Sequence, residues 1–321
     1  MQLVCNPEDN FQSQFHRRWG GLHDRHVRAL AWLLTAPDML DASAEQWQGR
    51  IARLDEGLLR TDLDGWLHAL DGEPAALHAY LGPLPFVRLG RYAEKLLAFY
   101  LAQLGVLLAH GVQVREDHRT IGEFDFLLSW RERLVHWEFA TKFYLLESSG
   151  NGHDADYFVG PNLADTLGAK LHKIFDRQLK LSEHPAARRH LPGPIANAQA
   201  LVKGWLFYHE GRHFMRADGT STSHCRGFWL PLEDVEHLRG QHFAILPRLD
   251  WLAPAQMTIE SVLNRETLRQ TLQNYFAQDR MPVMLAVLQV EGNVAREIER
   301  GFIVPADWQT RAAYRTKPLS H

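Results

Sequence analysis

Apolar residues recur at helical spacing through the first quarter of the chain. The pattern covers four segments, residues 26–36, 44–59, 66–70 and 75–80. In the second segment the predicted buried stripe is Trp47, Ile51, Leu54 and Leu58. Residues 1–20 lack the pattern, and we expect them to be flexible or loosely docked. Because the GPLP turn at 82–85 interrupts it, we predict an N-terminal helical region over residues 1–86.

The middle of the chain, residues 87–210, changes between helical and strand patterns. In chain order we predict a helix over 89–104 that ends before Gly105, a strand over 111–116, two strands on either side of the charged tip 130–133, a helix over 162–181 capped by Asn162, a linker over 185–194 and a strand over 202–208. The order of one helix, three strands, a helix and a strand indicates a mixed α/β unit.

Residues 211–321 alternate between short strands and helices. We predict strands over 226–230, 243–251, 283–290 and 301–304, helices over 233–238 and 266–277, and a polar tail. This C-terminal mixed α/β region could pair its strands with the middle unit or form a small layer of its own, and the sequence leaves both arrangements open.

Candidate chemistry lies in the predicted hairpin, GEFDFLLSWRERLVHWEFATKFYLL. If Ser129 pairs with Leu134 across the turn, Asp125 falls directly opposite Glu138. Lys142 is four residues beyond Glu138, an even offset, so we expect its side chain on the same face. The pattern predicts two acids and a lysine gathered on one face of an otherwise apolar hairpin.

Two facing carboxylates require neutralisation. Facing β-carbons lie about 4.5–5.5 Å apart, and two bare carboxylates at about 4 Å repel by roughly 4 kcal/mol at an intermediate dielectric. A shared proton, Lys142 or a divalent cation could remove this repulsion. One interpretation is a structural cluster of Asp125, Lys142 and Glu138. The other is a Mg²⁺ site, since that ion is commonly held by one or two carboxylates and substrate phosphates.

The order of these residues resembles the PD-(D/E)xK nuclease superfamily. In that order an acid on a helix comes first, then an aspartate on a strand, and then a glutamate followed by lysine on the neighbouring strand. The blocks LGRYAEKLLAFYL, GEFDFLL, HWEFATKFYL and GPNLADTLGAKL also resemble a bacterial family known only as a domain of unknown function. The superfamily resemblance covers roughly residues 87–210 and implies a restriction-endonuclease-like αβββαβ core. The family resemblance covers nearly the whole chain.

The superfamily resemblance also implies roles for individual residues. Asp125 would be the metal-binding aspartate, Glu138 the acid of the Glu-x-Lys element, Lys142 the lysine and Glu94 the helical glutamate, with Mg²⁺ or Mn²⁺ as the metal. The chain departs from the superfamily pattern in one place, because the position two residues after the glutamate is Ala140 and the lysine stands two residues further along.

Glu94 also has a structural interpretation. It shares the predicted buried face of its helix with Leu97 and Leu101, where a carboxylate is seldom left without a partner. A salt bridge with Arg91, one turn earlier, would supply that partner.

The helix predicted over 162–181 carries a basic stripe. Its members are Lys170, Lys173, Arg177 and Lys180. Such a stripe can be a solvated helix face, but beside a metal-binding hairpin it is a candidate track for nucleic-acid phosphates. The superfamily resemblance implies that Gln178 corresponds to a helical glutamine of some of these nucleases. The glycine-rich loop at 148–161 could lie over a bound phosphodiester.

A second metal motif occurs after the strand predicted over 202–208. The sequence His209-Glu210-Gly211-Arg212-His213 matches H-E-x-x-H, which binds zinc in peptidases when both histidines share one face of a helix. The central glycine and the flanking strand-like residues instead predict a hairpin turn, so we interpret the match as coincidental.

Composition limits the class of protein. Of 321 residues, 45% are hydrophobic and 23% charged, and the formal net charge is −3, so nucleic acid would have to be bound by a local basic patch. The two cysteines, Cys5 and Cys225, indicate a reducing compartment. The first twenty residues lack the apolar core of a signal peptide, and no run approaches the ~20 apolar residues of a membrane span. We expect a cytoplasmic protein.

Together these patterns predict a metal-dependent nuclease that hydrolyses DNA rather than RNA. A first alternative is a non-catalytic module that binds nucleic acid or protein on a nuclease fold, which the displaced lysine favours. A second is a zinc peptidase through the His209 to His213 motif. Strand preference and oligomeric state are left open.

Overall fold

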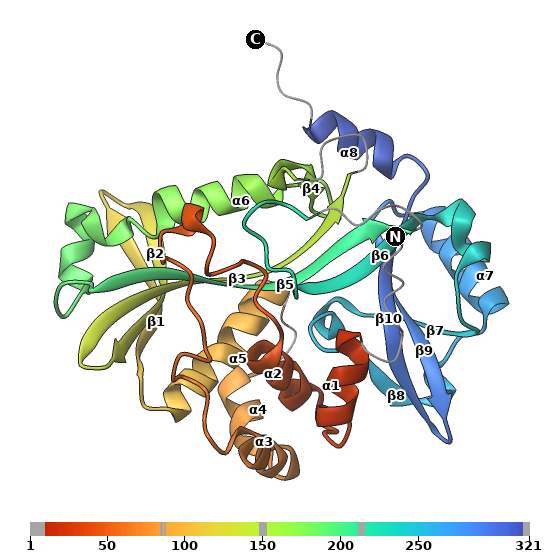
Figure 1. Cartoon of the computed structure of the whole chain (residues 1–321), viewed down its shortest axis with the longest axis horizontal. Helices are drawn as coiled ribbons and strands as arrows, with labels where there is room; N and C mark the ends of the chain where they lie inside the picture. Colours follow the sequence, from red (N-terminus) through yellow and green to blue (C-terminus); the bar gives the residue numbers. More distant parts are fainter. Residues whose placement is uncertain (1–9, 84–85, 87, 148–152, 211–215, 317–321) are drawn as a thin grey trace.

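A single mixed sheet forms the centre of the computed structural model, which describes residues 10–83, 86, 88–147, 153–210 and 216–316 (Figure 1). Within these residues the sheet has ten strands, and eight of them follow the order β1-β2-β3-β5-β6-β10-β9-β7. The remaining two, β4 and β8, pair with β3 and β10. The strands are β1 (Leu107–Glu116), β2 (Arg119–Trp130), β3 (Arg133–Leu146), β4 (Phe158–Val159), β5 (Asn197–His209), β6 (Cys225–Pro231), β7 (His242–Ile245), β8 (Gln256–Thr258), β9 (Val283–Glu291) and β10 (Val294–Val304).

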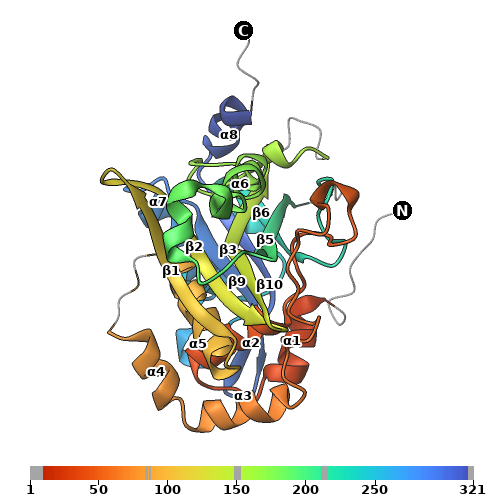
Figure 2. The ribbon, with the colours of Figure 1, turned by 90° about the vertical axis from the view of Figure 1, so that its left-hand side faces the viewer.

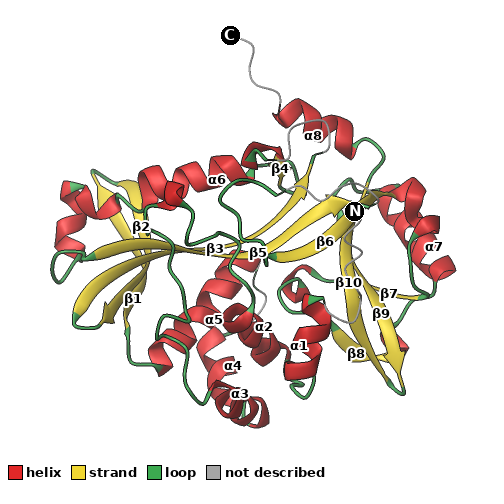
Figure 3. Ribbon diagram, viewed as in Figure 1, coloured by secondary structure: helices red, strands yellow, loops and turns green. Residues whose placement is uncertain are grey.

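Helices cover both faces of this sheet. The α-helices are α1 (Phe11–Trp19), α2 (Arg25–Thr35), α3 (Leu63–Gly72), α4 (Ala75–Leu81), α5 (Leu89–Gln103), α6 (Leu167–Lys173), α7 (Arg265–Phe276) and α8 (Trp308–Thr316). In the view of Figures 1 and 3, α1 to α5 gather below the sheet and α6 lies above it. Each layer has its own hydrophobic cluster, with Leu96 of α5 in one and Leu171 of α6 in the other.

The middle unit has the predicted order of elements. Helix α5 is followed by β1, β2 and β3, each antiparallel to the one before, and then, after the two-residue β4, by α6 and β5. Strand β5 returns parallel to β3, with register from Val135↔Asn197 to Leu145↔Phe207. A parallel return requires a crossover, and α6 lies in that connection. The αβββαβ arrangement expected over residues 87–210 is therefore present.

The C-terminal strands extend the same sheet, which decides between the two arrangements that the sequence left open. Strand β6 pairs with β5, and β10 pairs parallel with β6. The largest hydrophobic cluster contains Trp32, Leu145 and Phe302, one from each predicted region. The division at 1–86, 87–210 and 211–321 remains a prediction about folding units, but these regions share one sheet and one core.

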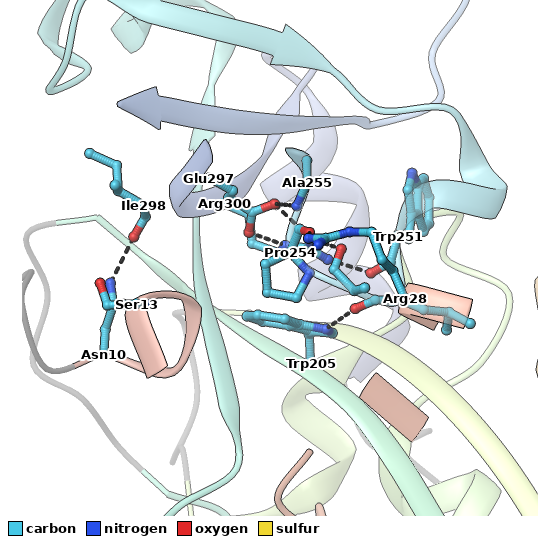
Figure 4. A network of polar contacts seen from close by, with 12 residues as sticks. Asn10, Ser13, Arg28, Trp205, Trp251, Pro254, Ala255, Glu297, Ile298 and Arg300 are labelled. Atoms are coloured by element: carbon cyan, nitrogen blue, oxygen red, sulfur yellow. Dashed lines mark hydrogen bonds and ion pairs between the residues drawn. The ribbon is translucent and has the colours of Figure 1, made fainter. Parts of the chain in front are cut away.

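Buried charges join the N-terminal helices to the C-terminal strands (Figure 4). The fully buried Arg300 donates from Nε and Nη2 to the two carboxylate oxygens of Glu297 at 2.6 and 2.7 Å. Its guanidinium also bonds the carbonyl of Trp251 and stacks over Trp205. From α2, Arg28 donates to the carbonyl of Pro254 at 2.9 Å. Because each buried charge is matched by carboxylate or carbonyl groups, the desolvation cost is offset and the two parts are held in one geometry.

Three further segments differ from their predictions. The region 1–20, expected to be flexible or loosely docked, contains α1, which Asn10 caps and whose Phe15 and Trp19 are buried. The C-terminal tail contains α8, anchored by the buried Trp308 and Ala312. The strand predicted over 243–251 ends at Ile245. An amphipathic segment of about nine residues is easily missed in a sequence, because one or two apolar residues suffice to dock it.

The helix predicted over 44–59 is wrong. Only a short 3-10 turn, Glu45–Trp47, forms there, and Ala52 N–H then donates to the carbonyl of Ala200 on β5. All four residues of the predicted stripe are buried, but Trp47 and Ile51 belong to one hydrophobic cluster and Leu54 and Leu58 to another. Apolar spacing identified the buried positions correctly and the backbone incorrectly.

The helix predicted over 162–181 starts later than expected. Its N-cap is Thr166, not Asn162, because Leu163 adopts a left-handed backbone with φ of 60°. After α6 the chain widens into a π-helical turn, Ile174–Gln178. The linker predicted over 185–194 contains a 3-10 segment, Pro185–His190. No helix in the described parts of the chain is long and apolar enough to cross a membrane.

Candidate active site

The β2–β3 hairpin has the predicted register. Ser129 pairs with Leu134, and the ladder continues to Trp130↔Arg133, which leaves a two-residue turn. Both turn residues have positive φ, as a tight hairpin with the right-handed twist of its strands requires. In the other direction the recorded pairs end at Phe126↔Trp137.

At this end of the ladder a side-chain oxygen, rather than a backbone carbonyl, accepts the hydrogen bond from a backbone N–H. The Asp125 Oδ2 atom accepts a hydrogen bond from the N–H of Phe139 at 2.9 Å. Asp125 also lies close enough to Glu138 for each carboxyl group to shift the pKa of the other. The two acids that the register placed opposite each other are thus neighbours.

Burial dominates the electrostatics of this pair. It raises the pKa of Asp125 to about 7, to which the neighbouring Glu138 carboxylate adds. Burial likewise raises the pKa of Glu138 to about 8, against the opposing effects of Lys170 and Asp125. In the absence of a metal ion, the two acids are therefore largely or partly protonated near neutral pH.

Two further acids complete the cluster. Carboxylate oxygens of Glu94 on α5 and of Glu123 and Asp125 on β2 all lie within 4.8 Å of one another. Burial, followed by the Asp125 charge, raises the pKa of Glu94 to about 7. Glu123 was not among the predicted site residues, although its position two residues before Asp125 on the same strand places both side chains on one face.

Arg91 neutralises part of this cluster. Its Nη1 atom lies 3.0 Å from Glu94 Oε1 and 2.7 Å from Glu123 Oε1. The salt bridge that was the alternative interpretation of Glu94 therefore exists. It does not exclude metal binding, because Arg91 is half exposed and can be displaced toward solvent.

The donor set fits a hard divalent cation. Mg²⁺ prefers oxygen ligands at about 2.1 Å, so one ion spans oxygens up to about 4.2 Å apart, and small side-chain rotations would bring the cluster into that range. Mn²⁺ accepts the same carboxylate ligands. Burial and the neighbouring carboxylates raise the pKa values of Glu94 and Asp125, and a bound cation would oppose both effects by favouring the ionised acids.

Glu138 is fixed from two sides. Its Oε1 atom lies 2.8 Å from His136 Nε2, and both side chains are buried. Its Oε2 atom accepts a hydrogen bond from Gln178. Burial lowers the pKa of His136 to about 4, so the ring is neutral at physiological pH and orients the carboxyl group without neutralising it.

Lys142 is engaged away from the acid pair. Its Nζ atom forms an ion pair with Asp165 Oδ2 at 3.1 Å, and the Tyr144 hydroxyl donates to the same oxygen at 3.0 Å. Asp165 precedes α6 and was not among the predicted site residues. Lys142 still lines the same cavity as Asp125, but its charge is matched by a different carboxylate.

A lysine from α6 approaches the acids instead. Lys170 Nζ donates to Gln178 Oε1 at 3.2 Å, and Gln178 in turn donates to Glu138. Burial and the neighbouring Lys142 lower the pKa of Lys170, while Asp125 and Glu138 raise it. Because a π-turn holds more residues than an α-helical turn, Gln178 returns to the side of the helix that carries Lys170.

The predicted basic stripe is consequently divided. Lys170 is half-buried at the acid cluster, whereas Lys173, Arg177 and Lys180 are exposed. A regular helix, on which the prediction was based, would not have separated these roles.

A cavity of about 750 Å³ joins these groups. Its lining includes Glu94, Asp125, Lys142, Asp165, Lys170 and Gln178. Pockets of this size accommodate a ligand of several hundred daltons. Gly160 of the predicted glycine-rich loop also lines the cavity, whereas Gly150 and Gly152 lie outside the described residues.

The H-E-x-x-H match cannot be placed as a unit. His209 ends β5, with its Nδ1 atom 2.8 Å from the carbonyl of Glu210. Gly211 and His213 lie outside the residues that the structure describes. The turn predicted there, and the zinc alternative, stay predictions.

The raised acid pKa values predict how the stability of the metal-free protein depends on pH. Each acid binds its proton more tightly when folded than when unfolded, where the ordinary value is near 4. The folded state therefore holds more protons between about pH 4 and 8, and the free energy of unfolding falls as pH rises through that range. We expect the loss to be smaller in Asp125→Asn by about 1–3 kcal/mol.

Urea unfolding in EDTA at pH 5, 6, 7 and 8 measures this difference. Comparison with the variant is needed because other buried acids, such as Glu299, also have raised pKa values. Parallel pH profiles for the two proteins would contradict the assignment of the effect to the acid pair.

The fold and the site define a mixed α/β protein with a buried acid cluster at a break between two strands of its sheet. The sequence profile of the family described as Domain of unknown function (DUF1853) matches residues 28–304. Because the match covers most of the chain, the protein belongs to this family. Neither the curated proteins nor the solved structures contain a match to the sequence.

Proposed function

We propose that this protein is a metal-dependent phosphodiesterase of nuclease type that hydrolyses DNA. The observation that carries the proposal is the convergence of Glu94, Glu123 and Asp125 at a cavity that is open to solvent and also lined by Lys170, with Glu138 buried beside Asp125. The αβββαβ order and the parallel return of β5 beside β3 support an assignment to the PD-(D/E)xK superfamily.

In this proposal Asp125, Glu138 and Glu94 hold Mg²⁺ or Mn²⁺. The ion, when bound, polarises the phosphate and lowers the pKa of an attacking water. His136 and Gln178 keep the Glu138 carboxyl group oriented, so that the ligand loses little conformational freedom on binding. Asp125 is held in the same way by the N–H of Phe139.

A lysine near the acids would stabilise the negative charge that develops on the phosphate. Two residues are candidates for this role. The superfamily resemblance implies Lys142, which lines the cavity but forms an ion pair with Asp165. The geometry favours Lys170, which reaches the acids through Gln178 and has no carboxylate within 4 Å among the described residues.

A non-catalytic module is the second candidate function. It is favoured by the ion pairs that already neutralise the acids, above all those of Arg91 with Glu94 and Glu123. In this alternative the cluster stabilises the junction between α5 and β2, and the surface binds nucleic acid or protein without cleavage. No observation on the described residues favours the zinc peptidase.

A cleavage assay tests the proposal. The purified chain is incubated with single- and double-stranded DNA, and with RNA, in Mg²⁺, Mn²⁺, Zn²⁺ or EDTA. We expect cleavage of DNA in Mg²⁺ or Mn²⁺ and none in EDTA. Retained DNA binding without cleavage under any metal would favour the non-catalytic module.

A further inference from the structure

A basic surface extends from the acid-lined cavity to the edge of the sheet. Beyond α6 the chain continues through the π-turn Ile174–Gln178 and two 3-10 segments, Leu181–Glu183 and Pro185–His190. The π-turn and the first segment lie against β2, and the second lies against β1. Figures 1 and 2 show these elements (green) along one face of β3, β2 and β1.

Positive charge is concentrated on this path. Residues 170–190 contain six Lys and Arg residues against two acids, Asp176 and Glu183, in a chain whose net charge is −3. Of the two acids, Asp176 is paired with His172 at 2.7 Å. The local sign of charge is therefore opposite to that of the protein as a whole, which is the condition for a nucleic-acid surface on an acidic protein.

We define the basic strip as the six exposed cations that follow this path: Lys173, Arg177, Lys180, Arg188, Arg189 and Arg115. Among the described residues none of the six lies within 4 Å of a carboxylate. The strip differs in this respect from Arg18, Arg53 and Arg60, which each pair with an aspartate. Arg189 and Arg115 do bond neutral groups, the Arg115 carbonyl and the Gln113 amide. Cations held apart from carboxylates can exchange their counterions for phosphates.

The composition of the basic strip does not suit the binding of single-stranded nucleic acid. Proteins that bind single-stranded nucleic acid stack its bases on exposed aromatic rings. Between residues 167 and 190 the one Phe, Tyr or Trp is Phe175, which is buried and stacked on Trp47 with ring centroids 4.7 Å apart. A surface of long cationic side chains without exposed rings contacts backbone phosphates and leaves the bases paired.

The length of the strip also suits a duplex. Helix α6 alone extends about 10 Å at 1.5 Å per residue, and the π-turn and the two 3-10 segments continue the path, against the roughly 34 Å of one turn of B-form DNA. The segment on β1 continues the surface beyond that point. A duplex lying along it would present consecutive phosphates to the strip, whereas a flexible single strand has no reason to remain extended over that distance.

We propose that the basic strip docks the phosphate backbone of duplex DNA without sequence preference and leads one strand toward the acid-lined cavity. The docking stands independently of catalysis, and only the destination of the DNA rests on the proposed function. The strip thereby gives the substrate class that the acids alone do not define, which is double-stranded DNA bound by its backbone.

A pair of matched double variants tests the proposal by binding in EDTA, where cleavage cannot occur. Arg177→Gln/Arg188→Gln removes two charges from the strip. Arg133→Gln/Arg239→Gln removes two exposed charges elsewhere, so that the net charge of the two proteins is the same. Fluorescence anisotropy with a 20-base-pair duplex of arbitrary sequence, from 50 to 200 mM salt, gives the affinity and its salt dependence. Melting temperatures check that both variants are folded.

We expect the strip variant to bind duplex about 10- to 60-fold more weakly at 0.1 M salt, with a slope of log K against log salt reduced by nearly two. The control variant should stay within about twofold of the wild type. A single strand of the same length should bind the wild type more weakly than the duplex does. Equal weakening in both variants, binding of the single strand as tight as that of the duplex, or no binding at 50 mM salt would each overturn the proposal.

The outcome is separable from that of the nuclease proposal. Strip-dependent duplex binding by a protein that never cleaves supports the docking surface and removes the enzyme. Cleavage by the wild type, together with a duplex affinity that is unchanged in Arg177→Gln/Arg188→Gln, supports the enzyme and removes the docking surface.

Discussion

Replacing Asp125 with asparagine should abolish metal-dependent cleavage, with a rate loss of at least about 10³-fold. Asp125 is the residue common to both groups of acids, because it influences the pKa of Glu138 and shares the cluster with Glu94 and Glu123. An amide oxygen can occupy the same position but does not supply the anionic ligand that Mg²⁺ prefers. A metal that stabilises transition-state charge contributes several kcal/mol, and each 1.36 kcal/mol corresponds to about tenfold in rate.

The asparagine should leave the fold intact. Its side-chain oxygen can still accept the hydrogen bond from Phe139 N–H, and one repulsive charge beside Glu138 is removed. We therefore expect a melting temperature in EDTA at pH 8 equal to or above that of the wild type, together with unchanged or slightly tighter binding of duplex DNA. Asp218→Asn, at a position 79% exposed, is a control for the same chemical change.

Three measurements on Asp125→Asn distinguish the possible outcomes. Cleavage is measured with Mg²⁺, metal affinity by titration calorimetry, and folding by thermal melting. A variant that folds, binds DNA and cleaves as fast as Asp218→Asn would remove Asp125 from the active site. A wild type that takes up no Mg²⁺ or Mn²⁺ would remove the metal site altogether.

The sequence predicted the register of the hairpin because two independent constraints agree there. Aromatic and β-branched runs define both strands, and a four-residue polar tip restricts where they can turn. Once Ser129 pairs with Leu134, the contact between Asp125 and Glu138 follows from the period of two along a strand. The same argument could have found Glu123, two residues before Asp125, because it needed no information beyond that period.

The position of Lys170 could not be predicted in the same way. A helical stripe with residues three and four apart assigns Lys170 to the same exposed face as Lys173 and Arg177. The π-turn that begins at Ile174 changes the number of residues per turn and brings Gln178 to Lys170. Nothing in the local composition indicates a π-turn, because it is stabilised by contacts with a sheet that forms from distant residues.

In the segment 44–59 the burial of side chains was predicted correctly, but the helical backbone was not. Its apolar residues are buried as predicted, but they belong to two clusters because the chain runs beside β5 rather than coiling. Burial depends on the side chains, whereas the backbone found its hydrogen-bond partner in Ala200, about 150 residues away. Tertiary pairing of this kind overrides local periodicity.

Alanine substitutions of the two lysines that line the cavity, Lys142 and Lys170, should have different effects on the cleavage rate and on stability. Lys170→Ala should lower the cleavage rate by about 10²-fold, since one preorganised electrostatic contact is worth on the order of 3 kcal/mol in catalysis. Lys142→Ala should lower it much less, because the charge of Lys142 is already matched by Asp165. Its cost should fall on stability instead, by less than about 1 kcal/mol, since the ion pair is partly exposed.

Rates, melting temperatures and pH profiles together decide between the two lysines. Lys170→Arg keeps the charge and should recover part of the rate, but the basic limb of the pH profile should move upward. The reason is that the pKa of Lys170 is lowered by burial, whereas an arginine stays protonated. A large rate loss in Lys142→Ala, with a near-normal rate in Lys170→Ala, would instead assign the catalytic role to Lys142. The superfamily resemblance implies that assignment. If both alanine variants melt at a lower temperature than the wild type, and the wild type does not cleave with any metal, the two lysines stabilise the fold and the acid cluster is structural.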